Sequence, residues 1–125
     1  MKPNKCRNKK VTIDGIVFDS LKEANRWKEL TLLERAGQIQ NLKRQVEYLL
    51  IPAQFGMVID KNGKHKRVCL ERAVNYVADF TYNIGEEFIV EDVKGYRNPS
   101  SAVYAKFIIK RKLMLHLYGI RIRET

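Results

Sequence analysis

The sequence is poor in the side chains that bind soft metals. It has two cysteines, Cys6 and Cys69, and two histidines, His65 and His116, with no Cys-x-x-Cys pair. A structural zinc site needs about four such ligands at short spacings. The sequence therefore predicts no zinc site, and both cysteines are expected to be free thiols in a reducing compartment.

Long hydrophobic runs are also missing. No segment approaches the roughly 20 apolar residues that cross a bilayer, and the first residues lead into no apolar signal region. With 45% hydrophobic and 30% charged residues, the composition is that of a globular protein. A chain of 125 residues suffices for one core but not for two. We expect one domain over residues 11–125 in a cytoplasmic protein without a membrane partner.

Acidic residues are few relative to basic ones. Lysine and arginine number 24 against 14 aspartates and glutamates, for a net charge of +10. This balance favours a polyanionic partner, because each neutralised phosphate releases counterions. DNA is the leading candidate, and an anionic membrane is the weaker one. Residues 1–10 hold five basic residues and no acid, and are expected to form a flexible basic arm.

Turn and capping signals mark the first elements. Asp14-Gly15 between two short apolar runs predicts an N-terminal β-hairpin. Ser20 and Glu23 have capping-box spacing, so a helix is expected over residues 20–36 with Gly37 as its terminator. Glu23 either closes this box or reaches a metal site from the helix, and the two roles are compatible.

The middle of the chain is predicted to be strand-rich. Residues 39–42 and 46–51 are expected to form strand, and residues 61–64 a hairpin turn. Gln45, between the first two runs, is interpreted as a surface residue rather than a site residue. After the turn, a basic cluster of His65, Lys66 and Arg67 follows.

A second helix is expected from Ser100 or Ser101 to Tyr118-Gly119, and a last strand over residues 120–123. At 100° per residue the helix has an apolar stripe of Val103, Phe107, Met114 and Leu117, with Lys110 in its middle. Lys110 either extends to solvent or points along the helix toward a negatively charged site.

Residues 76–94 carry the side chains on which the functional interpretation depends. Two strand-like runs are joined by Asn83-Ile84-Gly85-Glu86, which is turn chemistry because glycine adopts positive φ. An antiparallel hairpin of this kind brings Asp79 near Asp92 and Lys94. Two carboxylates and an ammonium group are then expected on one face of the sheet.

Alternation along a strand predicts which residues share a face. On the first run, one face is expected to carry Val77, Asp79 and Thr81, and the other Tyr76, Ala78, Phe80 and Tyr82. On the second run, Phe88, Val90, Asp92 and Lys94 are expected to fall together. Glu91 then points away from Lys94, so we interpret it as a structural or surface residue.

Paired carboxylates have a chemical interpretation. They repel each other and favour a hard divalent cation between them, most plausibly Mg²⁺. Such a cation polarises a phosphodiester and lowers the pKa of a bound water. A lysine on the same face orients that water or stabilises developing charge on the phosphate oxygens.

These residues and the order of the elements resemble the PD-(D/E)xK nuclease superfamily, and within it a phage-encoded family of small proteins. The patterns that carry the resemblance are Phe18-Asp19-Ser20-Leu21-Lys22-Glu23-Ala24, Tyr76-Val77-Ala78-Asp79-Phe80, Glu91-Asp92-Val93-Lys94-Gly95 and Lys110-Arg111-Lys112. The match runs from about residue 11 to the end. One departure is that the first acid follows Ala78, where proline is common in the superfamily.

The resemblance implies an α/β (α+β) fold with a restriction-endonuclease-like α-β-β-β-α-β core. Its mixed central sheet would be flanked by two helices and preceded by the N-terminal β-hairpin. It also implies that Mg²⁺, or Mn²⁺ in its place, is bound by Asp79, Asp92, Glu23 and the backbone carbonyl of Val93. The predicted catalytic residues are Asp79, Asp92, Lys94, Glu23 and Lys110.

Basic residues are expected to contact DNA, although solvation is the alternative for each. They are Lys66, Arg67, Arg97, Lys106, Lys110, Arg111 and Lys112. The sequence thus predicts a Mg²⁺-dependent endonuclease of phage or prophage origin, with branched DNA as the expected substrate. The alternative is a non-catalytic, basic nucleic-acid-binding protein. Because each chain would hold one site, a double-strand cut needs a homodimer or two encounters.

Overall fold

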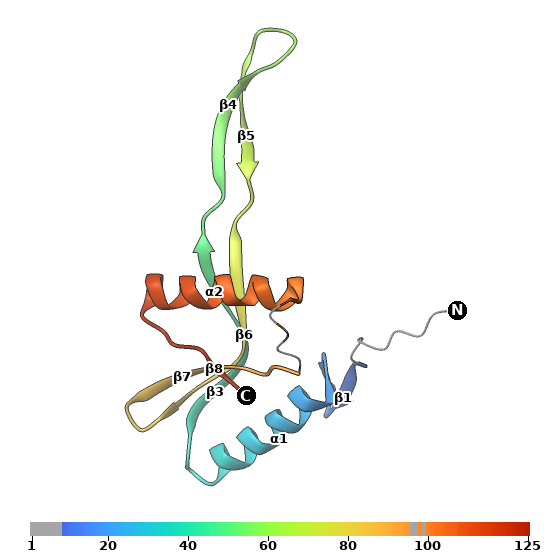
Figure 1. The fold of residues 1–125 in the computed structure, drawn as a ribbon, viewed down its shortest axis with the longest axis vertical. Helices are drawn as coiled ribbons and strands as arrows, with labels where there is room; N and C mark the ends of the chain where they lie inside the picture. The colour runs from blue at the N-terminus through green and yellow to red at the C-terminus, as the bar shows by residue number, and fades with distance from the viewer. Residues whose placement is uncertain (1–8, 96–97, 99) are drawn as a thin grey trace, which may run out of the picture.

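The structure is a computed structural model that describes residues 9–95, 98 and 100–125 (Figure 1). Most of the predicted basic arm, together with Cys6 and Arg97, lies outside the described residues. In chain order the elements are β1 (Val11–Ile13), β2 (Ile16–Phe18), α1 (Leu21–Arg35), β3 (Gln40–Ile51), β4 (Gln54–Ile59), β5 (His65–Glu71), β6 (Val74–Ile84), β7 (Glu87–Asp92), α2 (Ala102–Tyr118) and β8 (Arg123–Glu124).

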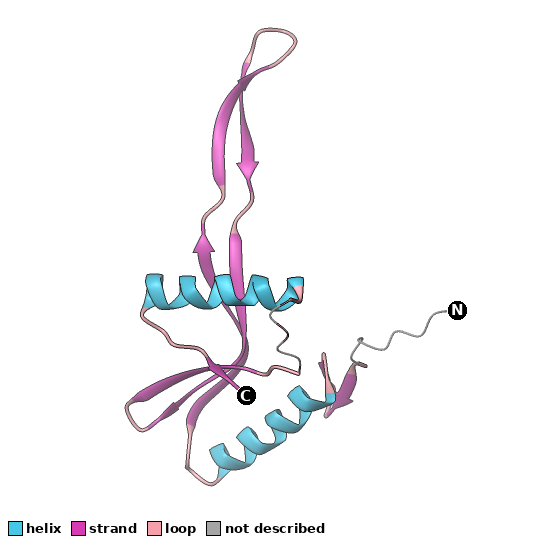
Figure 2. Ribbon diagram, viewed as in Figure 1, coloured by secondary structure: helices cyan, strands magenta, loops and turns pink. Residues whose placement is uncertain are grey.

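The main sheet has four strands in the order β3-β6-β7-β8. The first three are antiparallel, whereas β8 pairs with β7 in parallel, because α2 carries the chain back to the same end of the sheet. The hairpins β1–β2 and β4–β5 form two separate two-stranded sheets (Figure 2). The two helices and the main sheet therefore follow the predicted α-β-β-β-α-β order, which confirms the mixed α+β fold.

The capping and turn residues of the N-terminal part stand at the ends of the elements that they predict. The Ser20 hydroxyl accepts a 3.1 Å hydrogen bond from the Glu23 N–H at the start of α1, and Gly37 follows the helix with a φ of 77°. Asp14 and Gly15 have φ values of 51° and 80°, as a two-residue hairpin turn of the I′ type requires. The N-terminal hairpin and both ends of α1 are confirmed.

Two details of the C-terminal part differ from prediction. The last strand is Arg123–Glu124 rather than residues 120–123. On α2, Phe107 and Met114 are buried, but Val103 is 77% and Leu117 47% exposed. The apolar stripe is therefore shorter than predicted, since its two end positions, Val103 and Leu117, are turned away from the core that buries Phe107 and Met114.

The core consists of two clusters. One packs against α2 and contains Leu50, Tyr76, Ala78, Val90, Phe107, Met114 and Ile122. The other packs against α1 and contains Leu30, Ile39, Phe80, Tyr82 and Ile89. Tyr76 and Ala78 thus belong to a different cluster from Phe80 and Tyr82, so the prediction that these four residues share one face is wrong.

The change of face falls at Asp79, opposite an irregular residue of β3. The β3–β6 ladder pairs Arg44 with Phe80 and Val46 with Ala78, on either side of Gln45 and Asp79. Gln45 has a φ of 54°, in the left-handed region that non-glycine residues seldom adopt. A residue in this conformation breaks the regular alternation of side chains along a strand. The unpaired step between Gln45 and Asp79 coincides with the point where this strand pair passes from one cluster to the other.

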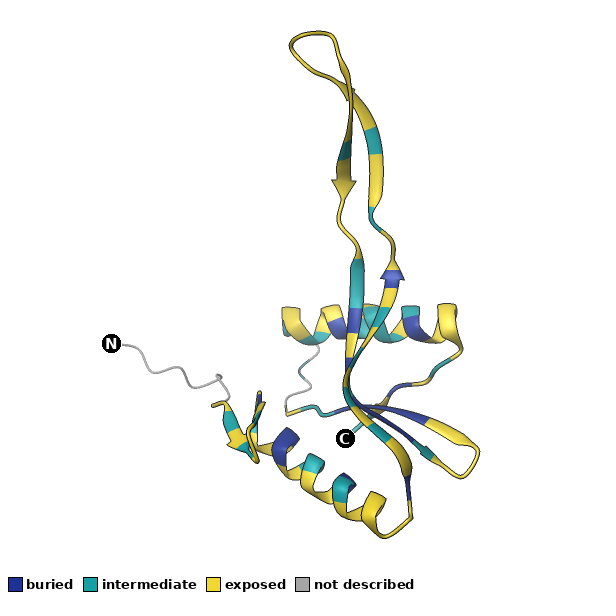
Figure 3. Ribbon diagram, turned by 180° about the vertical axis from the view of Figure 1, so that it is seen from behind, coloured by how far each residue is buried: buried dark blue, intermediate teal, exposed yellow. Residues whose placement is uncertain are grey.

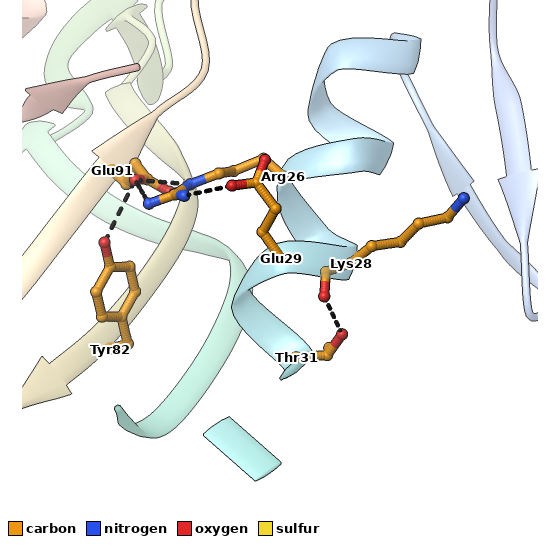
Figure 4. A network of polar contacts seen from close by, with 6 residues as sticks. All are labelled: Arg26, Lys28, Glu29, Thr31, Tyr82 and Glu91. Carbon is orange, nitrogen blue, oxygen red and sulfur yellow. Dashed lines mark hydrogen bonds and ion pairs between the residues drawn. The ribbon is translucent and has the colours of Figure 1, made fainter. Parts of the chain in front are cut away.

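A buried ion pair fastens α1 to β7. Arg26 donates to both carboxylate oxygens of Glu91, with its shortest contact at 2.7 Å, and the Tyr82 hydroxyl lies 3.3 Å from the same carboxylate (Figure 4). Glu91 is fully buried. These bonds raise the pKa of Arg26 and hold its charge in place. Glu91 therefore has the structural role that alternation allowed, and no surface role.

Two further observations concern the described cysteine and the character of the helices. Cys69 is an exposed free thiol. Within the described ranges, no helix combines the length and the apolar character needed to cross a membrane.

Candidate active site

Four of the predicted site residues come together where β7 ends. Asp79 lies on β6 and Asp92 ends β7; the pairing of Phe80 with Glu91 places the next two positions, Asp79 and Asp92, opposite each other. Glu23 joins them from the first turn of α1. Lys94 follows two residues after the strand. Three separate elements therefore converge on one acidic group, with the Lys94 ammonium beside it.

Asp79 is held by a backbone group and by a second acid. Its Oδ2 accepts a 2.8 Å hydrogen bond from the Val93 N–H, and its carboxyl lies beside that of Glu23. Two carboxyls this close favour a proton between them. Burial, the charge of Asp92 and the neighbouring Glu23 raise the pKa of Asp79 to about 8.

Glu23 experiences a similar environment. The residue is 5% exposed, and burial, with the charges of Asp19 and Asp92, raises the pKa of its carboxyl. The repulsion among Glu23, Asp79 and Asp92 is thus relieved by a bound proton. A cation placed among the three carboxyls would relieve it in the same way.

Asp92 is fixed at both carboxylate oxygens. Tyr76 donates a 2.6 Å hydrogen bond to Oδ2, and Nζ of Lys94 lies 2.9 Å from Oδ1. Asp92 is 6% exposed and Tyr76 3%, and burial beside Asp92 raises the pKa of the Tyr76 phenol. Tyr76 is therefore a neutral hydrogen-bond donor at any ordinary pH.

Lys94 is placed by an aromatic ring as well as by Asp92. Its Nζ lies 3.5 Å from the ring centroid of Phe107 on α2, a favourable cation–π position. Its side chain is 18% exposed. Its backbone carbonyl accepts a hydrogen bond from the side chain of Lys22. The ammonium is thus held between the acids and α2, with part of its surface open to solvent.

The chemistry of the donors suits a hard divalent cation, although the cluster is not a ready-made metal site. In the described part of the chain, no group of three or more His, Cys, Asp or Glu side chains is arranged to hold a metal ion. Glu23, Asp79 and Asp92 nevertheless offer only oxygen ligands, which is the preference of Mg²⁺. Asp79 contacts the Val93 N–H, and Asp92 contacts the Tyr76 phenol and the Lys94 ammonium. Binding a cation therefore requires these carboxyls to reorient.

The residues predicted to contact DNA are spread over two regions. Lys66 and Arg67 lie on β5, far from the cluster in Figure 1, and Arg67 packs over the ring of Phe55 at 4.1 Å. Lys106 and Lys112 are exposed on α2, where Lys110 is half-buried one turn beyond Phe107. Arg111 forms a 3.0 Å ion pair with Glu124. Contact of any of these residues with DNA stays a prediction.

Sequence reasoning missed Tyr76 and Phe107 as neighbours of the site. Tyr76 belongs to the pattern Tyr76-Val77-Ala78-Asp79-Phe80, but regular alternation places it on the face away from Asp79. In the structure Tyr76 nevertheless reaches the site, through its hydrogen bond to Asp92. The presence of Tyr76 in the motif was the only available signal. For Phe107 there was none, because its contact with Lys94 depends on the docking of α2.

The chain belongs to a known family. Residues 3–122 match the family described as "Protein of unknown function (DUF1064)". Neither the curated proteins nor the solved structures include a match to this sequence.

Proposed function

We propose that the protein is a Mg²⁺-dependent nuclease that hydrolyses phosphodiester bonds in DNA. The observation that carries this proposal is the meeting of Glu23, Asp79, Asp92 and Lys94 at the end of β7. Three acids and a lysine from distant parts of the chain, with the pKa of Asp79 raised to about 8, are typical of a functional site rather than of a structural ion pair. The net charge of +10 supports a polyanionic substrate.

Each residue of the cluster would have its own role in such a reaction. Glu23, Asp79 and Asp92, with the carbonyl of Val93, would hold the cation, and when bound it would polarise the scissile phosphate and acidify a water molecule. The proton shared by Glu23 and Asp79 leaves as these carboxyls ionise. Lys94, whose Nζ is already beside Asp92, orients the attacking water or donates to the phosphate oxygen on which negative charge develops. Lys110, one turn along α2 from Phe107, would contact the adjacent phosphate.

The finer parts of the proposal concern substrate and setting. Among the described residues, no element that reads base sequence adjoins the acidic cluster, so shape recognition is the mode that we propose, with branched DNA as the substrate. Endonucleolytic action in the cytoplasm of a bacterial host follows from the same resemblance to phage nucleases. A homodimer would be needed only for paired cuts.

Cleavage assays test the proposal directly. Supercoiled, linear and four-way-junction DNA are incubated with the protein, with and without Mg²⁺. We expect Mg²⁺-dependent cutting that is lost in Asp79→Asn and Lys94→Ala, with DNA binding retained. Glu47→Gln is the matched control, because Glu47 is an exposed acid on β3. Full single-turnover cleavage by either site variant would refute the assigned roles.

One observation favours the rival function of a non-catalytic DNA-binding protein. The acids already have partners in Val93, Tyr76 and Lys94, as purely structural acids would. Calorimetric titration with Mg²⁺ or Mn²⁺ separates the two functions. A nuclease should bind the ion, and Asp79→Asn should weaken this binding. A structural cluster should bind no ion at all.

A further inference from the structure

The hairpin of β4 and β5, residues 54–71, extends away from the rest of the molecule as a two-stranded arm (Figure 1). A two-stranded ribbon is only marginally stable in water unless something packs against it. Apart from Gly56 and Val68, which are half-buried, every residue of the arm is exposed (Figure 3). The arm therefore presents a long surface that the rest of the described chain leaves uncovered.

One face of the arm combines apolar and basic side chains. The register pairs Phe55 with Cys69, Met57 with Arg67 and Ile59 with His65, so these six residues share a face. Phe55, Met57 and Ile59 are 49%, 62% and 66% exposed. On this face β4 supplies three apolar side chains and β5 supplies Arg67, His65 and Cys69, and the Arg67 guanidinium lies over the Phe55 ring.

The tip of the arm is basic, and its one acid, Asp60, is hydrogen-bonded to the backbone of the turn. Lys61, Lys64 and Lys66 surround the turn. Asp60 is the acid, and its Oδ1 accepts the backbone N–H groups of Asn62 and Lys64 at 2.8 and 2.9 Å. The lysine ammonium groups at this end therefore remain available to an anionic partner.

We infer that this hairpin arm of β4 and β5 is a clasp for duplex DNA. The inference rests on the proposed function and adds to it a binding element remote from the cleavage site. Its lysines lie along phosphates, and the Phe55, Met57 and Ile59 face lies against the sugars and base edges of a groove. Ribbons with cations beside apolar side chains bind DNA in this way. Six residues of β4 span about 20 Å, or about six base pairs of duplex.

Charge and composition favour DNA over a second copy of the chain as the occupant. Two copies that each carry a net charge of +10 repel each other, whereas DNA attracts both the arm and the body. Lysine is also depleted from protein–protein interfaces, yet three lysines lie at this tip. The apolar residues Phe55, Met57 and Ile59 would suit either partner. The three lysines at the tip therefore favour DNA over a second copy of the chain.

The test compares two triple variants that lose the same charge. Lys61→Gln/Lys64→Gln/Lys66→Gln removes three charges from the hairpin of β4 and β5, and Lys28→Gln/Arg35→Gln/Lys43→Gln removes three charges from exposed basic residues elsewhere. Binding to a blunt duplex is measured in EDTA over a range of salt concentrations, so no cleavage occurs. For the arm variant we expect a salt dependence of log K that is shallower by about one unit per lost contact, with a footprint shortened at one end. The control should keep the wild-type slope.

Three outcomes would show that the hairpin of β4 and β5 is not a clasp for duplex DNA. They are a slope that is unchanged in the arm variant, equal changes in both variants, or no binding of duplex by the wild type. A further variant, Met57→Ser/Ile59→Ser, examines the apolar face by sedimentation. If it converts a dimer to a monomer without weakening DNA binding, a second copy is the occupant and the inference is wrong. Because binding is measured without metal, loss of the clasp and loss of nuclease activity are distinguished.

Discussion

The Tyr76 phenol donates a 2.6 Å hydrogen bond to Oδ2 of Asp92, while Lys94 holds the other carboxylate oxygen at 2.9 Å. Tyr76 and Asp92 are both buried and come from neighbouring strands. With both oxygens engaged, the Asp92 carboxylate has a fixed orientation. Tyr76 is therefore a positioning residue for the proposed metal site.

Removing the phenol should separate positioning from binding. In Tyr76→Phe the buried carboxylate loses a donor, which should cost about 1–3 kcal/mol of stability. We also expect a lower kcat and a higher Mg²⁺ concentration at half-maximal cleavage, with unchanged affinity for DNA. Tyr82→Phe is the matched control, since it removes a hydroxyl near Glu91 on the other face. If both variants show the same Mg²⁺ dependence as the wild type, Tyr76 has only a structural role.

The raised pKa of Asp79 predicts an unusual pH dependence of stability for the metal-free protein. Its pKa is raised from 3.8 to about 8 in the folded state, chiefly by burial. Between these values the unfolded state has lost a proton that the folded state retains, so the free energy of unfolding falls as the pH rises.

Urea unfolding in EDTA, from about pH 5 to about pH 8, measures this effect. Asp79→Asn should show a smaller decrease than the wild type and should be the more stable protein at the upper end. Asp14→Asn, at an exposed turn, should follow the wild-type curve. Parallel curves for the wild type and Asp79→Asn would contradict the raised pKa.

The Arg26–Glu91 pair should matter for stability and not for chemistry. Arg26→Met leaves the Glu91 charge buried without its partner, and we expect a loss of about 3–5 kcal/mol. The double variant Arg26→Met/Glu91→Leu should recover most of that loss, because two apolar side chains replace the pair. Glu29→Gln, which removes only an exposed partner of Arg26, should change stability by less than about 1 kcal/mol. Cleavage per folded molecule should stay at the wild-type level, and a specific loss would give Glu91 an active-site role.

The left-handed backbone at Gln45 gives a prediction with opposite signs for two substitutions. Gln45→Val should destabilise the protein by about 1–2 kcal/mol, because a β-branched residue tolerates positive φ poorly. Gln45→Gly should be neutral or stabilising, since glycine adopts this conformation without strain. Thermal or urea unfolding of the two variants measures the difference. Equal destabilisation by both would mean that the Gln45 side chain, rather than its backbone, is what matters.

Much of the architecture could be predicted because the signals for it are local. Asp14-Gly15 specifies a hairpin through its backbone preferences, and Ser20 starts α1 through one hydrogen bond to Glu23. The spacing of Asp79, Asp92 and Lys94 around a short turn brought them together for the same reason. A two-strand hairpin with a tight turn has very few possible registers.

The sequence by itself determined the N-terminal hairpin, both ends of α1 and the approach of Asp79 to Asp92, since each depends on residues close together in the chain. Only the tertiary structure decided that Tyr76 meets Asp92, that Lys94 lies on Phe107 and that Glu91 is buried with Arg26. Regular alternation assigns faces correctly only while every backbone angle is regular, and β3 carries left-handed residues at Asn41 and Gln45. Burial, in turn, depends on which helix covers each face, and that is fixed by packing between segments far apart in the sequence.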